Sequence, residues 1–129
     1  MKTRKEENIM NISFVTIPVS SLDETIKFYH EVLDFEVVTR FGAGPRMEIV
    51  FMADKKGNQL EFIQSGSEKV QHDGLISIGF NVDDIDATEA HLRKHNVNIT
   101  KGPDTLPSGV KLMHAHDLNG VGLGFVQRP

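Results

Sequence analysis

The residues of this sequence that stand out as candidates for chemistry are one glutamate and two pairs of closely spaced histidines. Glu61 lies in the segment NQLEFIQ, and His114 and His116 form a His-x-His pair in VKLMHAH. Carboxylates and imidazoles serve as general acids and bases, and both bind divalent metals. His91 and His95 have a helical i, i+4 spacing that can chelate a metal, but an ordinary helix face is the simpler interpretation.

The bulk composition narrows the classes of function. The 129 residues fit a single domain, and 39% apolar with 25% charged residues is typical of a soluble globular protein. A net charge of −4 argues against nucleic-acid binding, and no apolar run is long enough for a membrane span. The absence of cysteine excludes a thiolate nucleophile and sulfur-based zinc sites. The charged start MKTRKEEN lacks an apolar segment behind it, so we expect no signal peptide, a flexible tail over residues 1–10 and a cytoplasmic protein.

The sequence repeats itself with a constant offset of 63 residues. DLNGVGLGFVQ (117–127) aligns with DKKGNQLEFIQ (54–64), and VDDIDAT (82–88) aligns with VSSLDET (19–25). Such internal similarity indicates a duplicated structural unit. We therefore predict one domain over residues 11–128, built from module 1 (11–66), a polar linker (67–74) and module 2 (75–128).

Each module is expected to form a strand, a helix and three further strands. NISFVTIPV is rich in β-branched residues, as strands are, and Ser21 with Glu24 forms a capping box at a helix start. Tyr29 falls on the apolar face of that helix, which predicts a core position. Asp54 and Asp117 begin tight turns and are interpreted as structural. The predicted fold class is α+β, with two tandem βαβββ modules forming a curved mixed sheet around a cleft.

Period-two alternation orients the last strand of each module. In NQLEFIQ, Leu60 and Phe62 share one face, expected to lie under the helix, and Glu61 points the opposite way. The repeat places Gly124 where module 1 has Glu61. Two explanations stay open for this glycine: it makes room for an organic ligand or a neighbouring ring, or it permits sheet curvature.

The segment VSSLDETIKFYHEVLDF (19–35) and the two Asp-x-x-Gly hairpins resemble the vicinal oxygen chelate superfamily. That superfamily includes glyoxalase I, extradiol dioxygenases, fosfomycin resistance enzymes and bleomycin resistance proteins. The resemblance covers Asn11 to Gln127 and implies the duplicated fold with a cleft for small molecules. It does not imply one reaction, because the same scaffold carries many chemistries.

In metal-dependent members of that family, the resemblance implies four ligand positions, which here are Phe14, Glu61, Ser77 and Gly124. The repeat supports this mapping, because Phe14 aligns with Ser77 and Glu61 with Gly124. Only Glu61 is a strong ligand, and a serine hydroxyl is a weak one. Three protein ligands are the usual minimum for a catalytic site. We therefore expect no metal in the usual arrangement and no cofactor.

The resemblance also implies that Leu112 and His114 face the cleft. Glu61 and His114 could then form a catalytic acid–base pair, or could join His116 as a rearranged site for one divalent ion (Ni, Zn, Mn or Fe). The simpler alternative is one structural and one solvated histidine. The predicted ligand-binding residues are mainly apolar with a few polar groups, as is usual in small-molecule pockets: Phe14, Thr16, Ile49, Phe51, Gln59, Ile63, Ser77, Asn81, Leu112, Gly122 and Gly124.

Three functions are consistent with these residues. The first is binding of a small organic molecule without a metal, as the resemblance to bleomycin resistance proteins implies. The second is a glyoxalase I-like lyase or isomerase that uses a divalent metal at the rearranged site. The third is metal-free acid–base catalysis by Glu61. Family members commonly dimerise, so a homodimer is expected, with no nucleic acid or membrane among its partners.

Overall fold

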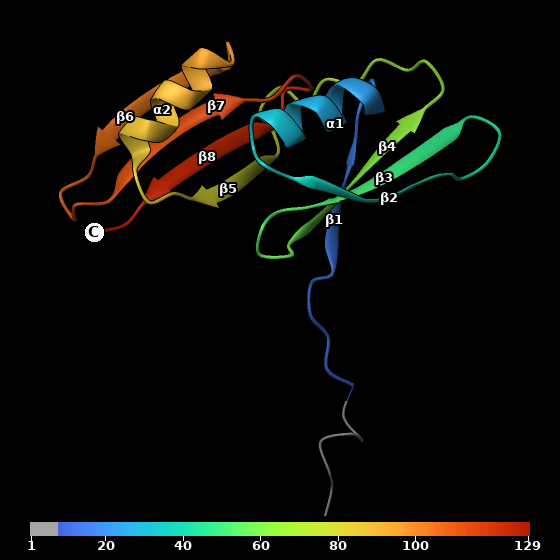
Figure 1. Ribbon diagram of the computed structural model, residues 1–129, viewed down its shortest axis with the longest axis horizontal. Coiled ribbons are helices and arrows are strands. Elements are labelled where there is room, and N and C mark those ends of the chain that lie inside the picture. The colour runs from blue at the N-terminus through green and yellow to red at the C-terminus, as the bar shows by residue number, and fades with distance from the viewer. Residues whose placement is uncertain (1–7) are drawn as a thin grey trace, which may run out of the picture.

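The computed structural model describes residues 8–129, which form two four-stranded sheets with one helix on each (Figure 1). Module 1 contains β1 (Phe14–Pro18), α1 (Leu22–Glu31), β2 (Glu36–Gly42), β3 (Met47–Ala53) and β4 (Gln59–Ser65). Module 2 contains β5 (Ser77–Asn81), α2 (Ile85–Lys94), β6 (Asn98–Thr105), β7 (Lys111–His116) and β8 (Gly122–Gln127). The strand orders are β1-β4-β3-β2 and β5-β8-β7-β6, with the first pair of each sheet parallel and the others antiparallel. The predicted α+β fold of two βαβββ modules is confirmed.

The sequence repeat is also a repeat of hydrogen bonds. Oε1 of Gln64 accepts from the backbone N–H of Leu22 at 2.8 Å, and Oε1 of Gln127 accepts from that of Ile85 at 2.7 Å. These N–H groups belong to the first helical turns, which have no acceptor within their own helix. The matching glutamines of the two copies therefore tie the last strand of each module to the start of its helix.

Both helices begin directly after a capping residue, which is the predicted Ser21 for α1 and Asp84 for α2. Oγ of Ser21 accepts from the backbone N–H of Glu24 at 3.2 Å. Oδ1 of Asp84 accepts from the N–H groups of Asp86 and Ala87 at 3.0 and 3.1 Å. Such caps replace the acceptors that the first turn lacks, and each contributes about 1 kcal/mol.

The core of module 1 lies between its helix and its sheet. Leu60 and Phe62 of β4 are buried in one cluster with Leu22 and Tyr29 of α1. The corresponding residues of β8, Leu123 and Phe125, are buried in the second cluster together with Leu92 of α2. The predicted helix-side residues of β4 and the core position of Tyr29 are confirmed.

A buried polar cluster connects α1 to the turn between β7 and β8. Oη of Tyr29 donates to Oδ2 of Asp117 at 2.6 Å, and Nδ2 of Asn119 donates to Oγ1 of Thr25 at 3.1 Å. All four side chains are buried, and we call them the junction network. The position of Tyr29 in the second copy is occupied by Leu92, so the repeat does not carry this network twice.

Tyr29 is held in its neutral form by this environment. Burial is the main cause that raises the pKa of the phenol well above its ordinary value, and the negative charge and hydrogen bond of Asp117 raise it further. A phenolate in this place would be both desolvated and next to a carboxylate.

Asp54 and Asp117 close equivalent turns, as predicted. In both, Oδ1 accepts from the backbone N–H groups two and four residues downstream, at distances between 2.7 and 3.0 Å. Burial alone would raise the pKa of Asp54, but hydrogen bonds from Asn58, Lys56 and Gly57 lower it overall. Asp54 is only half-buried, so its turn is accessible to water, whereas the turn at Asp117 is buried against α1.

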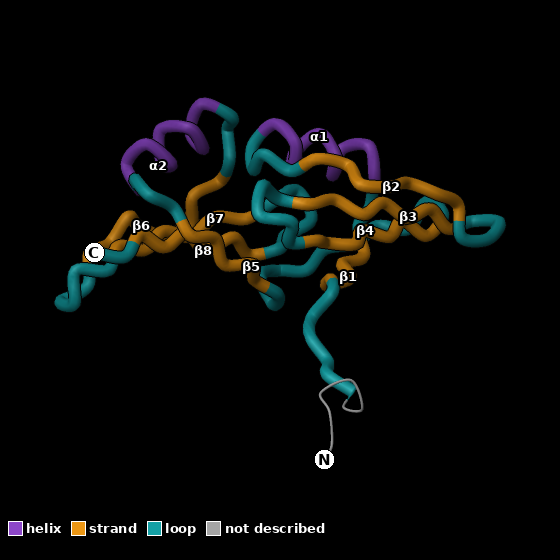
Figure 2. Tube along the Cα trace, turned by 60° about the horizontal axis from the view of Figure 1, so that its bottom comes forward, coloured by secondary structure: helices purple, strands orange, loops and turns teal. Residues whose placement is uncertain are grey.

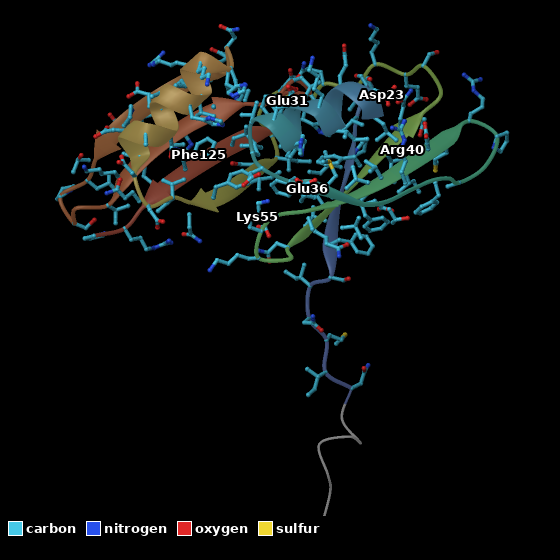
Figure 3. The ribbon with its side chains drawn as sticks, in the orientation of Figure 1. Asp23, Glu31, Glu36, Arg40, Lys55 and Phe125 are labelled. Atoms are coloured by element: carbon cyan, nitrogen blue, oxygen red, sulfur yellow. The ribbon has the colours of Figure 1, made fainter. Side chains whose placement is uncertain are left out.

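Arg40 of β2 connects β2 and β3 to α1 (Figure 3). Its Nη1 donates to Asp23 in the first turn of α1, and its Nε donates to Glu48 of β3, both at 2.8 Å. The hydrogen bonds with Glu48 and Asp23 raise the pKa of Arg40 above its ordinary value. The positive charge of this guanidinium is therefore balanced by two carboxylates on the helix side of the sheet.

The two helices lie on the same side of the two sheets, so each sheet has one face without a helix (Figure 2). β1 begins at Phe14 and not at Asn11, where the predicted strand begins, because β4 begins opposite it at Gln59. Residues 1–7 of the predicted tail lie outside the described residues. In the described part of the chain, no helix is long and apolar enough to cross a membrane.

Candidate functional site

The helix-free face of the first sheet, which we call the open face, carries the predicted carboxylate. In the strand register, Glu61 pairs with Thr16 on one side and with Phe51 on the other. Directly paired residues project from the same face of a sheet. The register thus places a group of predicted ligand-binding residues on this face with Glu61: Phe14, Thr16, Ile49, Phe51, Gln59 and Ile63.

Glu61 is positioned by one hydroxyl group. Oγ1 of Thr16 donates a hydrogen bond to Oε1 of Glu61 across the β1–β4 pair. Among residues 8–129, no lysine, arginine or histidine forms an ion pair with Glu61. The half-buried carboxylate is therefore oriented by Thr16 without neutralisation by a cation.

Three phenylalanines cross the open face beside Glu61. The rings of Phe14 and Phe51 have centroids 4.9 Å apart and meet edge to face at 88°. Those of Phe51 and Phe41 are 6.4 Å apart and nearly parallel, at 18°. Phe14 and Phe41 are 42% and 43% exposed, which leaves ring surface accessible to a ligand. We call Phe14, Phe51 and Phe41 the aromatic row.

Phe41 is absent from the residues that the sequence predicts for the site. A register irregularity between Val37 and Thr39 interrupts the alternation of β2. An irregularity of this kind reverses the faces of all residues beyond it, so alternation alone misplaces them. The hairpin with β3 settles the face, because Phe41 pairs with Ile49.

On the helix-free face of the second sheet, the two glycines of β8 have different surroundings. Gly124 pairs with His114, and a Cβ added at Gly124 would lie 3.8 Å from Nδ1 of His114, an ordinary contact. The imidazole thus lies beside the glycine. A Cβ at Gly122, in contrast, would lie 3.2 Å from the carbonyl oxygen of Ile76, which accepts from the N–H of Gly122 at 2.7 Å. Gly122 is therefore explained by the close approach of the neighbouring backbone, which leaves no room for a side chain. At Gly124 a side chain would fit, and the missing one leaves space beside the His114 ring.

The other residues predicted on module 2 also project from this face. Ser77 pairs with Gly122, and Asn81 and Leu112 both pair with Val126. Oδ1 of Asn81 accepts from Nη1 of Arg128 at 2.5 Å, so this amide has a partner within the chain. His114 is exposed and His116 is half-buried next to Gly74.

The donor set does not fit the metal centre that the resemblance implies. Of the four corresponding positions, Phe14 and Gly124 have no side-chain atom that can bind a metal. Ser77 is a weak ligand, and only Glu61 is a strong one. The direct neighbour of Glu61 is Thr16, and the direct neighbour of Gly124 on β5 is Gly79. In the described part of the chain, no three histidine, aspartate or glutamate side chains are close enough to hold an ion. Glu61, His114 and His116 are accordingly not brought together as a ligand set.

A small cavity of about 140 Å³ lies where the two modules meet. Its lining includes Gln59 of the first helix-free face and Gly79 of the second. Pockets that enclose drug-sized ligands typically have a volume of roughly 300–1,000 Å³. The cavity is too small for such a ligand, and Glu61 is not among its lining residues.

Comparison with solved structures shows the same fold in proteins of low sequence identity. A glyoxalase family protein from Bacillus cereus has a TM-score of 0.80 at 18% identity, covering 97% of this chain and 98% of that one. TnmS3, an antibiotic binding protein from Streptomyces sp. CB03234, has a TM-score of 0.76 at 21% identity, covering 95% and 99%. The trypanothione-dependent glyoxalase I of Leishmania major has a TM-score of 0.79 at 22% identity, covering 92% and 87%.

No curated protein sequence matches the chain. The sequence does match a protein-family model, that of the Glyoxalase/Bleomycin resistance protein/Dioxygenase superfamily, over residues 11–125. That match spans both modules, including the open face and the second helix-free face. The chain therefore belongs to the Glyoxalase/Bleomycin resistance protein/Dioxygenase superfamily.

Proposed function

We propose that this protein binds a small planar organic molecule on the open face, without the metal centre typical of its superfamily. The observation that carries the proposal is the ionisable side chain of Glu61, oriented by Thr16 and flanked by the aromatic row. No cation of the described residues neutralises this carboxylate, so its charge is available to a ligand.

The chemistry of the open face defines the ligand class. Exposed phenylalanine rings bind flat apolar groups by stacking and edge contacts, and they attract cations over their faces. A carboxylate accepts hydrogen bonds from ammonium or N–H groups, and such charged hydrogen bonds are the stronger ones. A planar aromatic compound that carries an amine or another cationic N–H donor satisfies both features. The antibiotic-binding description of TnmS3 is consistent with binding of an organic compound on this fold.

A second candidate is metal-free general-base catalysis by Glu61. The hydrogen bond from Thr16 fixes the orientation of the carboxylate, and a general base has to be held in such a fixed position. His114 would be the second group of the predicted pair, but it lies on the other sheet, and no hydrogen bond joins it to Glu61 in the described residues. Ligand binding without conversion therefore has the stronger support.

The first test is metal uptake by the purified protein. After incubation with Ni, Zn, Mn or Fe and removal of free ions, elemental analysis should find well below one equivalent of metal per chain, because one strong ligand is too few. Stoichiometric metal that is lost in Glu61→Ala would overturn the metal-free proposal and support the glyoxalase I-like alternative.

The second test is a thermal-shift screen of planar aromatic amines, followed by calorimetry of any hit. For such a hit, Glu61→Gln and Phe51→Ala should each weaken binding about tenfold, since a charged hydrogen bond or an aromatic contact contributes about 1–2 kcal/mol. Glu31→Gln is the matched control, because Glu31 is an exposed residue of α1, on the opposite side of the same sheet (Figure 3). Equal affinity in all variants would place the ligand elsewhere, and product formation abolished by Glu61→Gln would favour catalysis.

A homodimer and a cytoplasmic location are part of the same proposal. The open face is not enclosed by the single chain, since Phe14 and Phe41 retain more than two fifths of their surface exposed. A second subunit would supply the enclosure that small-molecule sites usually have.

A further inference from the structure

The two histidines at the end of α2 lie with their rings side by side. His91 belongs to the last turn of the helix and His95 is its C-cap, so their i, i+4 spacing places both at one end of α2. Their ring centroids are 4.7 Å apart, and the ring planes are tilted by 58°. The proposed ligand site does not include this pair, because α2 covers the opposite side of the sheets from the helix-free faces (Figure 1).

One hydrogen bond sets the tautomer of His91. Its Nε2 lies 2.8 Å from the carbonyl oxygen of Val32, which is the C-cap of α1. A carbonyl oxygen can only accept, so Nε2 carries the proton and donates it. In the neutral ring this leaves a lone pair on Nδ1. Metal-binding histidines are held in the same way, with the second ring N–H donating to a carbonyl or carboxylate oxygen.

The separation of the two rings fits a shared metal ion. In the described residues, the histidine rings that form hydrogen bonds are those of His30, His72 and His91, so the ring of His95 is available. An ion lies about 2.0–2.1 Å from a histidine nitrogen, and hence about 3.2 Å from the centre of the ring. Two rings that share one ion at roughly 90–110° therefore have centres about 4.5–5.2 Å apart. The observed 4.7 Å falls within this range.

The surroundings of the pair suit a cation. The end of a helix carries partial negative charge on its free carbonyl groups, and cations are stabilised there. His95 also lines a hollow of about 550 Å³ between α1 and the end of α2. The charged side chains around this hollow are two carboxylates and two ammonium groups, which balance each other: Glu24, Glu31, Lys27 and Lys94. The hollow has room for the water molecules that complete the coordination of an ion with two protein ligands.

We propose that His91 and His95 form a site for one divalent transition-metal ion, which the chain binds reversibly. Nδ1 of His91 and a ring nitrogen of His95 are the two protein ligands, and imidazole nitrogens suit Cu²⁺, Ni²⁺ and Zn²⁺. The site is independent of the open face, because Glu61 contributes nothing to it. Coordination at Nδ1 leaves the bond from Nε2 to Val32 intact, so the ion holds α2 of module 2 against the end of α1 of module 1.

Calorimetric titration of the untagged full chain with NiCl₂ tests this site at equilibrium. Two imidazoles release an ion when free metal is removed, so the site adds little metal in the uptake experiment described above. One Ni²⁺ should bind per chain, with Cu²⁺ bound more tightly and Mn²⁺ more weakly. His95→Ala should weaken Ni²⁺ binding at least about tenfold, because the second of two linked ligands adds strongly to the affinity of the first. If the unmodified chain shows no saturable Ni²⁺ binding, the inference is wrong.

His114→Ala is the matched control, because His114 and His116 form the other closely spaced pair and belong to β7. This variant should bind Ni²⁺ as tightly as the unmodified protein does. Paramagnetic broadening of NMR signals by Cu²⁺ locates the ion, and the signals of His91 and His95 should broaden first. Broadening centred on the β7 pair, or loss of Ni²⁺ binding in His114→Ala, would refute the inference. The calorimetry of aromatic amines would still decide whether the open face binds a ligand.

Discussion

Asp117→Ala should lower the free energy of unfolding by about 3 kcal/mol, which is a large fraction of the stability of a small domain. The substitution removes the acceptor of three hydrogen bonds, from the phenol of Tyr29 and from the backbone N–H groups of Asn119 and Val121. Asp117 and Asn119 are buried, so water cannot easily replace the lost carboxylate. Buried donors without an acceptor cost more than the net value of the bonds they made.

The sequence repeat provides the control for this experiment. Asp54→Ala removes the same two turn-closing bonds at the equivalent position of module 1, in a turn that is accessible to water. Its cost should be about 1 kcal/mol, because water can satisfy the freed N–H groups. Urea denaturation measures both variants against the unmodified protein. Equal losses would show that the buried junction network contributes nothing beyond the turn itself.

The second large effect concerns alkaline pH. The folded protein raises the pKa of Tyr29 well above its ordinary value of 10.0, mainly by burial and also through Asp117. Below about pH 10 the phenol is protonated in both the folded and the unfolded protein, so the free energy of unfolding is not reduced by its ionisation. Above that pH the unfolded chain loses the proton and the folded chain keeps it. The free energy of unfolding should therefore fall with rising pH, by up to about 1.4 kcal/mol per unit.

This effect is directly observable, because Tyr29 is the one tyrosine of the sequence and there is no tryptophan. Tyrosinate absorbance and secondary structure can be followed in one alkaline titration. The absorbance should appear only together with the loss of secondary structure. Tyr29→Phe should have a flatter stability profile above pH 10, although it is less stable at neutral pH because Asp117 loses a donor. Tyrosinate absorbance in the folded state, with an ordinary titration curve, would contradict the burial of this phenol.

The junction network also has a consequence for the site. It connects α1 of module 1 to the β7–β8 turn of module 2, while the repeat has Leu92 where Tyr29 stands. The network thus holds the two modules together on one side of their boundary. On the other side, Asp54 and Gly79 line the small cavity between the modules. The relative placement of the two helix-free faces therefore depends both on the apolar packing between the modules and on buried bonds that only one copy supplies.

Much of the fold follows from patterns along the chain. The offset of 63 residues predicts equivalent elements, and α1 and α2 indeed begin and end at positions that differ by this offset. Alternation in β4 correctly assigns Leu60 and Phe62 to the helix side and Glu61 to the opposite face. These features are local: a residue's neighbours at two, three or four positions decide which face of a strand or helix it occupies.

The aromatic row shows why part of the site cannot be predicted in this way. Phe14, Phe51 and Phe41 belong to three strands, and the irregularity in β2 changes the face on which Phe41 projects. The hydroxyl partner of Glu61 is likewise set by the parallel pairing of β1 with β4. Pairings between distant strands depend on the packing of the whole sheet, which no short window of sequence contains.

The sequence by itself determined the duplicated architecture, the capped helix starts, the structural aspartates of the turns and the face on which Glu61 lies. Only the tertiary structure decided that Tyr29 reaches Asp117, that His114 lies beside Gly124 and that the rings of three strands form one row. The physical reason is the range of the interactions involved. Periodicity and capping act within a few residues, whereas these contacts join residues far apart in the chain, and they form only when both modules pack together or adjacent strands pair.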